Sequence, residues 1–399
     1  EVRVNKWIKF IILYLGGVVV CLSQLKIVPV MDELSVFLGV PMSQLSWLMS
    51  IFSFAGLVLA IPGGAFLSRF GGKKLAVSIM AFLFLGNILG AFVVESNFYL
   101  LLASRAIEGI SFSLTIMVGI VLISYWFPES ESGLPIGIYG TFSALGSLIA
   151  MNVFRPMMDS FGIMSLWLSV AGVSLVGLVL FYLFLDAPEH VIKVDDQAGK
   201  ASIREAAENK MVLVLAFSQG CMAFVLFTFI TVYPQIFMGF YGLSPESANF
   251  YTSLFGLFGI PFGAVAGYAI DKTGKPGMVT FVSFAVMTLA TLYTVFLNGS
   301  ATYVIQVFLL STAISLASTS VMITVPRIVK RKELLGYSLS FVTQMYYIGI
   351  FIGSPLVLWM VERSSWVAGI YLMTGVSLLG TLGVFYFMIS SNLDKKQSA

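Results

Sequence analysis

The chain is divided into a succession of apolar runs, each about as long as a helix that crosses a bilayer. Such a helix needs about 20 apolar residues, whereas a transmembrane strand shows about ten residues of alternating polarity. Because 58% of the residues are hydrophobic and only 10% are charged, we predict an all-α integral membrane protein with twelve transmembrane helices. The runs lie at about 7–31, 45–67, 75–94, 98–126, 134–154, 164–185, 211–238, 249–270, 277–297, 301–325, 336–361 and 366–390.

Glycines repeat between the first and second halves of the chain at one fixed spacing. Glycine is the residue required where a side chain does not fit or where φ is positive. A shared spacing therefore indicates shared backbone geometry and predicts two pseudo-symmetric six-helix bundles. Four pairs are 203 residues apart: Gly64 with Gly267, Gly71 with Gly274, Gly133 with Gly336, and Gly146 with Gly349.

A single long polar stretch separates the sixth apolar run from the seventh. It is rich in charge and extends over residues 186–210. We predict an N-terminal six-helix bundle over residues 1–185, a cytoplasmic linker over 186–210 and a C-terminal six-helix bundle over 211–399.

Lysines and arginines are distributed unequally between the loops. If the amino terminus is cytoplasmic, all but four of the 22 lie on the cytoplasmic side. The positive-inside rule then places both termini in the cytoplasm of a multi-pass protein of the cell (inner) membrane. The four exceptions are Lys26, Arg105, Arg155 and Arg363. We expect Arg155 and Arg363 near the outer surface, which leaves Lys26 and Arg105 within the membrane.

A short polar motif joins the second apolar run to the third, and its counterpart joins the eighth to the ninth. Together with the two six-helix halves, these motifs resemble the loop signature Gly-x-Leu-Ala-Asp-Arg-x-Gly-Arg-Lys of the major facilitator superfamily of transporters. The first copy departs from it, with Ser68 in place of aspartate. The resemblance implies a conformational latch, whereas the cations alone would also satisfy topology. The latch residues are Gly64, Arg69, Gly71, Lys73, Gly267, Asp271, Lys272 and Gly274.

The fourth apolar run contains a second match to the family. Arg105-Ala106-Ile107-Glu108-Gly109 resembles the Arg-x-x-Gln-Gly element, with glutamate in place of glutamine. The Gly-Pro pair typical of the drug antiporter branch is absent, because no proline lies between Gly137 and Gly146. The resemblance covers essentially the whole chain and indicates a transporter fold without identifying a substrate.

Two charges of this element lie deep in the membrane. Arg105 is expected about 10 Å and Glu108 about 15 Å below the outer end of the helix near Phe98. A spacing of three places them on one helical face, and such charges are normally functional or paired. Lys26 lies roughly 9 Å below Asp32, the expected outer end of the first helix.

The resemblance implies that helices 1, 4, 7 and 10 line a central cavity and therefore brings Lys26 and Arg105 towards it. For each residue a structural alternative exists. Arg105 and Glu108 could form a self-neutralising pair, Lys26 could extend to the outer interface, and the hydroxyls could join neighbouring helices. The candidate substrate-binding residues are Lys26, Arg105, Gln24, Gln219, Ser311 and Ser315.

The charges predict the kind of substrate. Lys26 and Arg105 against Glu108 leave a net charge of about +1, which favours a small organic, carboxylate-like anion. Glu108 is the only carboxylate deep in a predicted helix. Since burial opposes and Arg105 favours its ionisation, we expect Glu108 to couple transport to protons. The predicted function is secondary active transport by rocker-switch alternating access.

Two other functions remain open from the sequence. One is a proton-coupled efflux antiporter for apolar or cationic compounds, and the other is a non-transporting membrane sensor. The sequence contains no recognisable nucleotide-binding loop, metal cluster or nucleophile triad. We therefore expect no enzyme activity, cofactor, metal or nucleic-acid partner. We expect a monomer in the lipid bilayer whose partners are a small molecule, in keeping with the predicted anion, and, for coupled transport, protons.

We also expect the glycine faces of helix 5 (Gly137, Gly140) and helix 11 (Gly349, Gly353) to pack the halves together.

Overall fold

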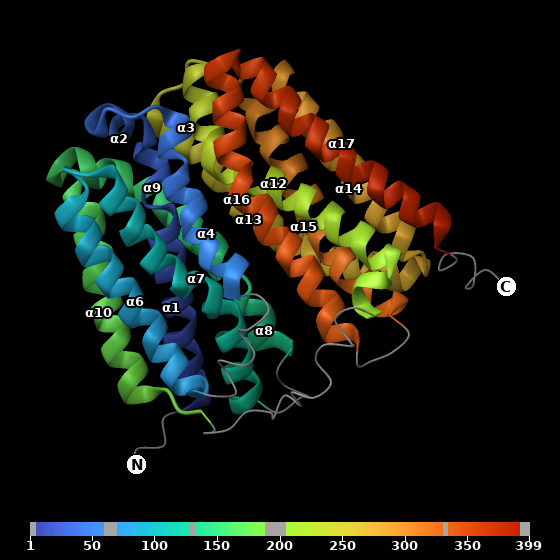
Figure 1. Cartoon of the computed structure of the whole chain (residues 1–399), viewed down its shortest axis with the longest axis horizontal. Helices are drawn as coiled ribbons and strands as arrows, with labels where there is room; N and C mark the ends of the chain where they lie inside the picture. Colours follow the sequence, from blue (N-terminus) through green and yellow to red (C-terminus); the bar gives the residue numbers. More distant parts are fainter. Residues whose placement is uncertain (1–4, 60–69, 128–132, 188–204, 330–333, 392–399) are drawn as a thin grey trace. The chain divides into compact units, whose positions relative to one another are not determined.

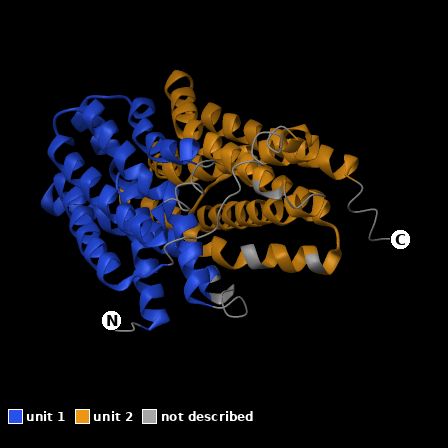
Figure 2. Ribbon diagram, turned by 60° about the horizontal axis from the view of Figure 1, so that its bottom comes forward, with its two compact units in different colours: residues 1–194 blue, residues 195–399 orange. Residues whose placement is uncertain are grey.

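The computed structural model describes residues 5–59, 70–127, 133–187, 205–329 and 334–391, and apart from short connections these are helical (Figure 1). No strand occurs within these ranges. Contacts divide the chain into two compact units, residues 1–194 and 195–399 (Figure 2). This division falls inside the polar stretch that was predicted to be the linker, of which residues 188–204 lie outside the described ranges.

Unit 1 is a bundle of helices in which the first apolar run is broken. α1 ends at Leu25 and is followed by the 3-10 turn η1 and the short helix α2, which is capped by Gly39 with φ 65°. The helices of unit 1 are α1 (Lys6–Leu25), η1 (Val28–Val30), α2 (Met31–Leu38), α3 (Met42–Leu45), α4 (Trp47–Leu59), α6 (Gly72–Val93), α7 (Phe98–Trp126), α8 (Gly133–Tyr139), α9 (Phe142–Phe161) and α10 (Met164–Phe184).

Unit 2 consists of longer, less interrupted helices. The sequence explains where its first helix, α12, begins. The side-chain oxygen of Asn209 accepts hydrogen bonds from the backbone N–H groups of Met211 and Val212 at 3.2 and 3.3 Å, as an N-cap residue does. The helices of unit 2 are α12 (Lys210–Gly239), α13 (Pro245–Thr273), α14 (Pro276–Tyr293), η3 (Thr294–Phe296), α15 (Ser300–Ile328), α16 (Leu335–Arg363) and α17 (Trp366–Ser390).

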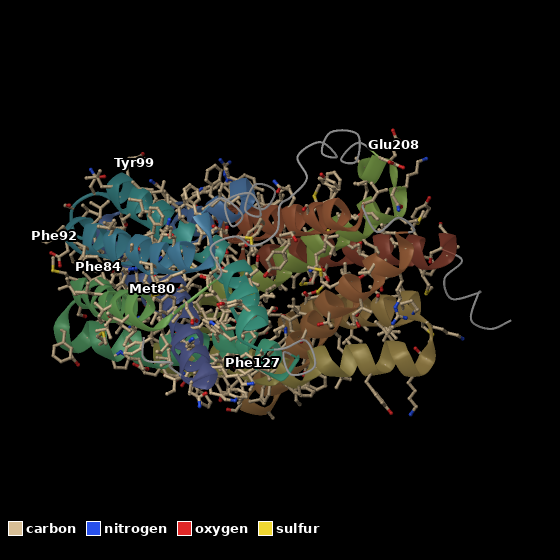
Figure 3. The ribbon with its side chains drawn as sticks, turned by 90° about the horizontal axis from the view of Figure 1, so that it is seen from below. Met80, Phe84, Phe92, Tyr99, Phe127 and Glu208 are labelled. Carbon is tan, nitrogen blue, oxygen red and sulfur yellow. The ribbon has the colours of Figure 1, made fainter. Side chains whose placement is uncertain are left out.

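Ten helical segments among the described residues are long and apolar enough to cross a membrane. α9 and α13 are not among these ten, although they contain 20 and 29 residues. Bulky aromatic side chains mark the turn between α6 and α7: Phe92 and Tyr99 lie at the periphery of unit 1 and are 72% and 73% exposed (Figure 3). Aromatic residues are typical of the membrane interface, so this turn fits a bilayer surface.

Corresponding glycines make corresponding contacts in the two units. A Cβ at Gly146 on α9 would lie 2.5 Å from the Cβ of Cys21 on α1, and one at Gly349 on α16 would lie 2.1 Å from the carbonyl oxygen of Gly220 on α12. Only a residue without a side chain allows such close helix packing. The predicted repeat between halves therefore recurs as the same helix pair in each unit.

The expectation that the helix 11 glycines pack the two halves together is wrong. Gly349 and Gly353 both face α12 of their own unit, where a Cβ at Gly353 would lie 3.0 Å from the carbonyl oxygen of Phe224. Gly140 is exposed, and the side-chain position of Gly137 lies outside the described residues. In unit 2, this small-residue surface fastens a bundle internally.

Candidate functional site

The deep charges predicted from sequence meet inside unit 1. Lys26 lies directly after the last residue of α1, while Arg105 and Glu108 lie one turn apart on α7. All three side chains are fully buried, with no exposed surface. Burying charges is costly unless they are paired and hydrogen-bonded, so the partners of each group determine what this cluster can do.

Glu108 is held through one of its two carboxylate oxygens. Oε2 accepts hydrogen bonds from Ser23 Oγ at 2.6 Å, Lys26 Nζ at 2.7 Å and Arg105 Nη1 at 2.7 Å. Oε1 is also buried and has no hydrogen-bond partner within the described part of the chain. A buried oxygen without a partner is energetically unfavourable and is typical of a position that another group or a proton occupies.

Arg105 closes the broken end of α1. Its Nη1 donates to the carbonyl oxygen of Ser23 at 2.6 Å, and its Nη2 donates to that of Gln24 at 2.8 Å. The last carbonyls of a helix have no partner within the helix, and in a bilayer water does not supply one. Arg105 Nε also donates to the carbonyl oxygen of Leu48 on α4, and its guanidinium lies 4.4 Å from the ring centre of Phe52.

Lys26 is held by three helices. Its Nζ donates to Asn87 Oδ1 on α6 and to Glu108 on α7, and it lies 4.8 Å from the ring centre of Trp167 on α10. Asn87 in turn donates to Ser23 Oγ at 3.1 Å and to the carbonyl oxygen of Leu83 at 2.8 Å. The prediction that Lys26 and Arg105 lie close together is consistent with this arrangement, and the alternative in which Lys26 extends to the interface is not.

Two glycines allow α4 and α6 to approach α7 closely enough to enclose the cluster. A Cβ at Gly109 would lie 2.2 Å from the carbonyl oxygen of Phe52, and one at Gly86 would lie 2.6 Å from Glu108 Cγ. Both distances are impossible for a real side chain. The glycine that ends the Arg105–Gly109 element is therefore explained by helix packing beside the charges.

A group from outside can reach the cluster only if it opens, because its three charged side chains are fully buried. Two cations against one carboxylate give the cluster a net charge of about +1. Gln24 lies at the edge of the cluster and is 6% exposed. In the described unit both cations are bound to protein groups, and they share the carboxylate of Glu108 as a partner. This geometry fits a binding site in which substrate competes with Glu108, and it also fits the structural pair left open from the sequence.

The candidate residues of unit 2 make mostly structural contacts. Ser311 donates to the carbonyl oxygen of Phe255, and Ser315 donates to that of Gly259 at 2.9 Å, so both join α15 to α13. Gln219 on α12 donates to Ser318 Oγ at 3.3 Å. Its Oε1 is buried without a hydrogen-bond partner in the described residues. Of the three, Gln219 therefore retains a capacity for binding.

The latch residues are only partly described. Gly64 and Arg69 lie outside the described residues, as does the side chain of Asp271. Gly71 and Gly274 have φ of 77° and 64°, a left-handed region that favours glycine.

Two latch lysines and one latch glycine can be placed more fully. Lys73 lies 5.7 Å from the ring centre of Tyr182, and Lys272 lies 5.6 Å from that of Tyr268. Gly267 lies within α13 rather than at its end. A Cβ at Gly267 would make an ordinary contact at 3.7 Å with Ile323. Close packing therefore does not require glycine at this position.

Three members of the cluster were not found from the sequence. They are Ser23, Asn87 and Trp167, which hold Glu108 or Lys26. Asn87 could have been found as the sole asparagine in the apolar run at about 75–94, because polar residues within membrane helices usually have a partner. Serine and tryptophan are both common in membrane helices, so Ser23 and Trp167 give no such signal.

Comparison with known proteins identifies the family. A family model described as Major Facilitator Superfamily matches residues 13–353 and 215–399. The chain belongs to the major facilitator superfamily. The predicted family resemblance is therefore confirmed, and so is the fold class: an all-α, multi-pass membrane protein with the family's twelve-helix, two-bundle fold.

Several similar proteins are named transporters. The probable galactarate/D-glucarate transporter GudP of Bacillus subtilis (strain 168) is 25% identical over 62% of this chain and 60% of its own length. The hexuronate transporter of the same organism is 25% identical over 67% of this chain and 66% of its own length. The probable sulfoacetate transporter SauU of Cupriavidus necator is 22% identical over 62% of this chain and 63% of its own length. The aligned region thus spans less than two thirds of each of these relatives.

Proposed function

We propose that this superfamily member is a secondary active transporter for a small organic anion with a carboxylate group. The two bundles, residues 1–185 and 211–399, would rock about a central site and expose it alternately to each side. The division of contacts between Val194 and Asp195, inside the proposed linker at 186–210, supports two bodies that move separately. The distribution of lysine and arginine supports a place in the cell membrane with both termini in the cytoplasm.

The buried excess of positive charge is the observation that carries this proposal. Lys26 and Arg105 outnumber Glu108, and no other group with hydrogen bonds to these three is charged in the described part of unit 1. An entering carboxylate would restore neutrality. The names of the three relatives support the same class, because galactarate, hexuronates and sulfoacetate all carry carboxylate groups.

Lys26 is the cation best suited to change partners. An ammonium group has three N–H donors, and Lys26 uses them on two side chains and the face of one ring. Arg105 is committed to three backbone carbonyls as well as to Glu108. A substrate carboxylate would therefore displace Glu108 from Lys26 while Arg105 kept the end of α1 closed.

Glu108 would link this exchange to protons. Protonation removes its charge and weakens its attraction for Lys26, so a proton and an anionic substrate would favour the same open cluster. Such mutual dependence is the basis of proton-coupled transport of an anion. Gln24, Gln219, Ser311 and Ser315 are proposed as neutral hydrogen-bonding residues for the rest of the substrate.

The polar loops would control the exchange between inward-open and outward-open states. Gly71 and Gly274 both have positive φ, which supports a need for glycine in each loop, although Gly71 precedes α6 and Gly274 follows α13. We propose Gly64, Arg69, Gly71 and Lys73 in one loop, and Gly267, Asp271, Lys272 and Gly274 in the other, as this latch. The protein is proposed to act as a monomer and not as an enzyme.

Ligand-induced thermal stabilisation of the purified full chain tests the substrate class. Galactarate, glucuronate and sulfoacetate would be compared with an organic cation such as tetraphenylphosphonium. A ligand at about 100 times its Kd stabilises the folded state by roughly 2.7 kcal/mol. At least one anion should stabilise the wild type and fail to stabilise Lys26→Met, whereas the control Lys210→Met should respond like the wild type. Stabilisation by the cation alone would favour the efflux function, and an unchanged response of Lys26→Met would assign the cluster a structural role.

A further inference from the structure

A second binding site lies on unit 1, away from the buried charges. α4 and α6 each pack against α7 but are not closely packed on one another among the described residues. The space between them is a groove of about 690 Å³, with α7 as its floor. In Figure 1, α4 and α6 lie on either side of α7.

The groove is apolar along nearly all its length. Its walls include Val58 of α4 and Phe82 of α6, and Ala106 and Ile110 of α7 lie on its floor. The hydroxyl of Ser78, a polar lining residue, donates to the carbonyl oxygen of Leu75 in its own helix. The lining therefore offers apolar contact and no hydroxyl donor that needs an outside partner.

The one charge in the lining is Lys74, near the start of α6. This side chain is exposed and makes no ion pair within the part of the chain that the structure describes. No carboxylate lines the groove to oppose it. Lys73, the next cation, lies beside the Tyr182 ring on α10.

We propose that this groove binds one acyl chain of an anionic phospholipid, with the headgroup phosphate against Lys74. The groove follows α6 from Lys74 to Phe82, which is about 12 Å of helix. That length is close to one leaflet of a hydrocarbon core roughly 30 Å thick. α4, α6 and α7 all belong to membrane-spanning segments, and an apolar channel ending in an unopposed cation matches a lipid tail below an acidic headgroup.

The position of the groove gives the lipid a route to the charge cluster. Ala106 and Ile110 lie on α7 on either side of Glu108, and Ala106 directly follows Arg105. A lipid that fills the groove would contact α4, α6 and α7 at the same time and so favour the packing of these three helices that the structure describes. It would therefore stabilise the arrangement in which the cluster is closed.

Native mass spectrometry of the purified full chain tests the site directly. Phosphatidylglycerol and phosphatidylcholine with identical acyl chains would compete for retention on the protein. The wild type should retain one phosphatidylglycerol with a preference of about fivefold, the effect expected from one lysine near an anionic headgroup. Lys74→Gln should bring the ratio close to one, while Lys210→Gln, a cation of unit 2, should leave it unchanged.

Filling the groove separates tail binding from headgroup binding. Ala106→Phe should lower retention of both lipids, and Val58→Trp, at a position that is already 55% exposed, provides a second filling variant should Ala106→Phe not fold. Equal retention of the two lipids by the wild type would overturn the proposal. Undiminished retention in the filled variants would do so as well, because it would place the lipid elsewhere.

Discussion

Lys26 and Glu108 meet through a single oxygen: Nζ lies 2.7 Å from Oε2, while Oε1 has no hydrogen-bond partner among the described residues. The carboxylate is thus held from one side only. A proton arriving at Oε1 would break none of the three hydrogen bonds at Oε2 and would still remove the negative charge that attracts Lys26. This asymmetry supports a role for Glu108 in proton coupling and leads to the first prediction.

Glu108→Gln should leave substrate exchange across the membrane intact and remove its stimulation by an imposed pH gradient. Glutamine keeps the size and hydrogen bonding of the side chain but does not titrate. Transport into proteoliposomes would be measured with and without a pH gradient, with Glu95→Gln, an exposed carboxylate near the start of α7, as control. Retention of the full pH response by Glu108→Gln would leave Glu108 as the structural partner of Arg105.

Arg105→Ala should lower the free energy of unfolding by about 3–5 kcal/mol, the usual cost of removing one partner from a buried ion pair. It also leaves the carbonyls of Ser23 and Gln24 without their donor. The double variant Arg105→Ala/Glu108→Gln should lose less than the sum of the single losses, because the two groups interact. Unfolding of all four proteins in detergent measures this coupling, and strict additivity would contradict it.

Gly349→Ala should destabilise the protein by about 1–3 kcal/mol through overpacking. The added Cβ would lie 2.1 Å from the carbonyl oxygen of Gly220, which is backbone and cannot rotate away. Gly375→Ala is the matched control, because a Cβ there has no atom within 4 Å. The midpoint of thermal unfolding would be measured for both variants. Similar midpoints for Gly349→Ala and Gly375→Ala would mean that α12 and α16 separate easily.

Asp186 should stabilise the protein at neutral pH and lose this effect in acid. Its partial burial acts to raise the pKa, but hydrogen bonds from Lys9 and Trp126 and the charge of Lys9 outweigh this, so the pKa lies below its ordinary value of 3.8. Because the folded-state pKa is the lower one, the stabilisation is complete above the unfolded-state pKa and disappears as the pH falls through the folded-state pKa. The stability difference between wild type and Asp186→Asn should be constant above about pH 5 and shrink below it. A difference that grows towards acid would have the wrong sign.

Asp271→Asn should slow the exchange between inward-open and outward-open states more than it weakens substrate binding. The equivalent position of the first half holds Ser68, so Asp271 is the surviving carboxylate of the proposed latch. Transport rate and equilibrium affinity would be measured on the same preparation, with Glu246→Gln at the other end of α13 as control. A loss of affinity at an unchanged maximal rate would exclude this role.

The apolar runs predicted the long helices well, and the first helix shows why they did not predict all of them. The run at about 7–31 is continuous in hydropathy, yet α1 ends at Leu25 and a 3-10 turn and α2 follow. Pro29 lies in that turn, and the donor that closes α1 is Arg105, about 80 positions later in the sequence. A helix end fixed by a distant side chain cannot be found from local composition.

The charged part of the candidate site was predictable because charge is rare in apolar runs. Lys26, Arg105 and Glu108 were identified for that reason and lie together. Hydroxyl groups were less informative: Ser311 and Ser315 have the spacing of a polar stripe, but in the structure they bond to α13. A hydroxyl serves equally well to join helices or to bind a substrate, and only its neighbours decide between these roles.

The hydrogen bonds from Arg105 to the end of α1 also limit how the specificity of such a transporter can change. A chain that exchanged this arginine for a different substrate preference would have to provide new donors for two backbone carbonyls in a place that water does not reach. Replacing Lys26 would leave no backbone carbonyl without a donor, because the hydrogen bonds of its ammonium group all go to side chains. If Lys26 binds substrate as proposed, substrate preference within this scaffold is free to diverge at Lys26 first, and an arginine retained at position 105 across many relatives would report on their shared architecture rather than on a shared substrate.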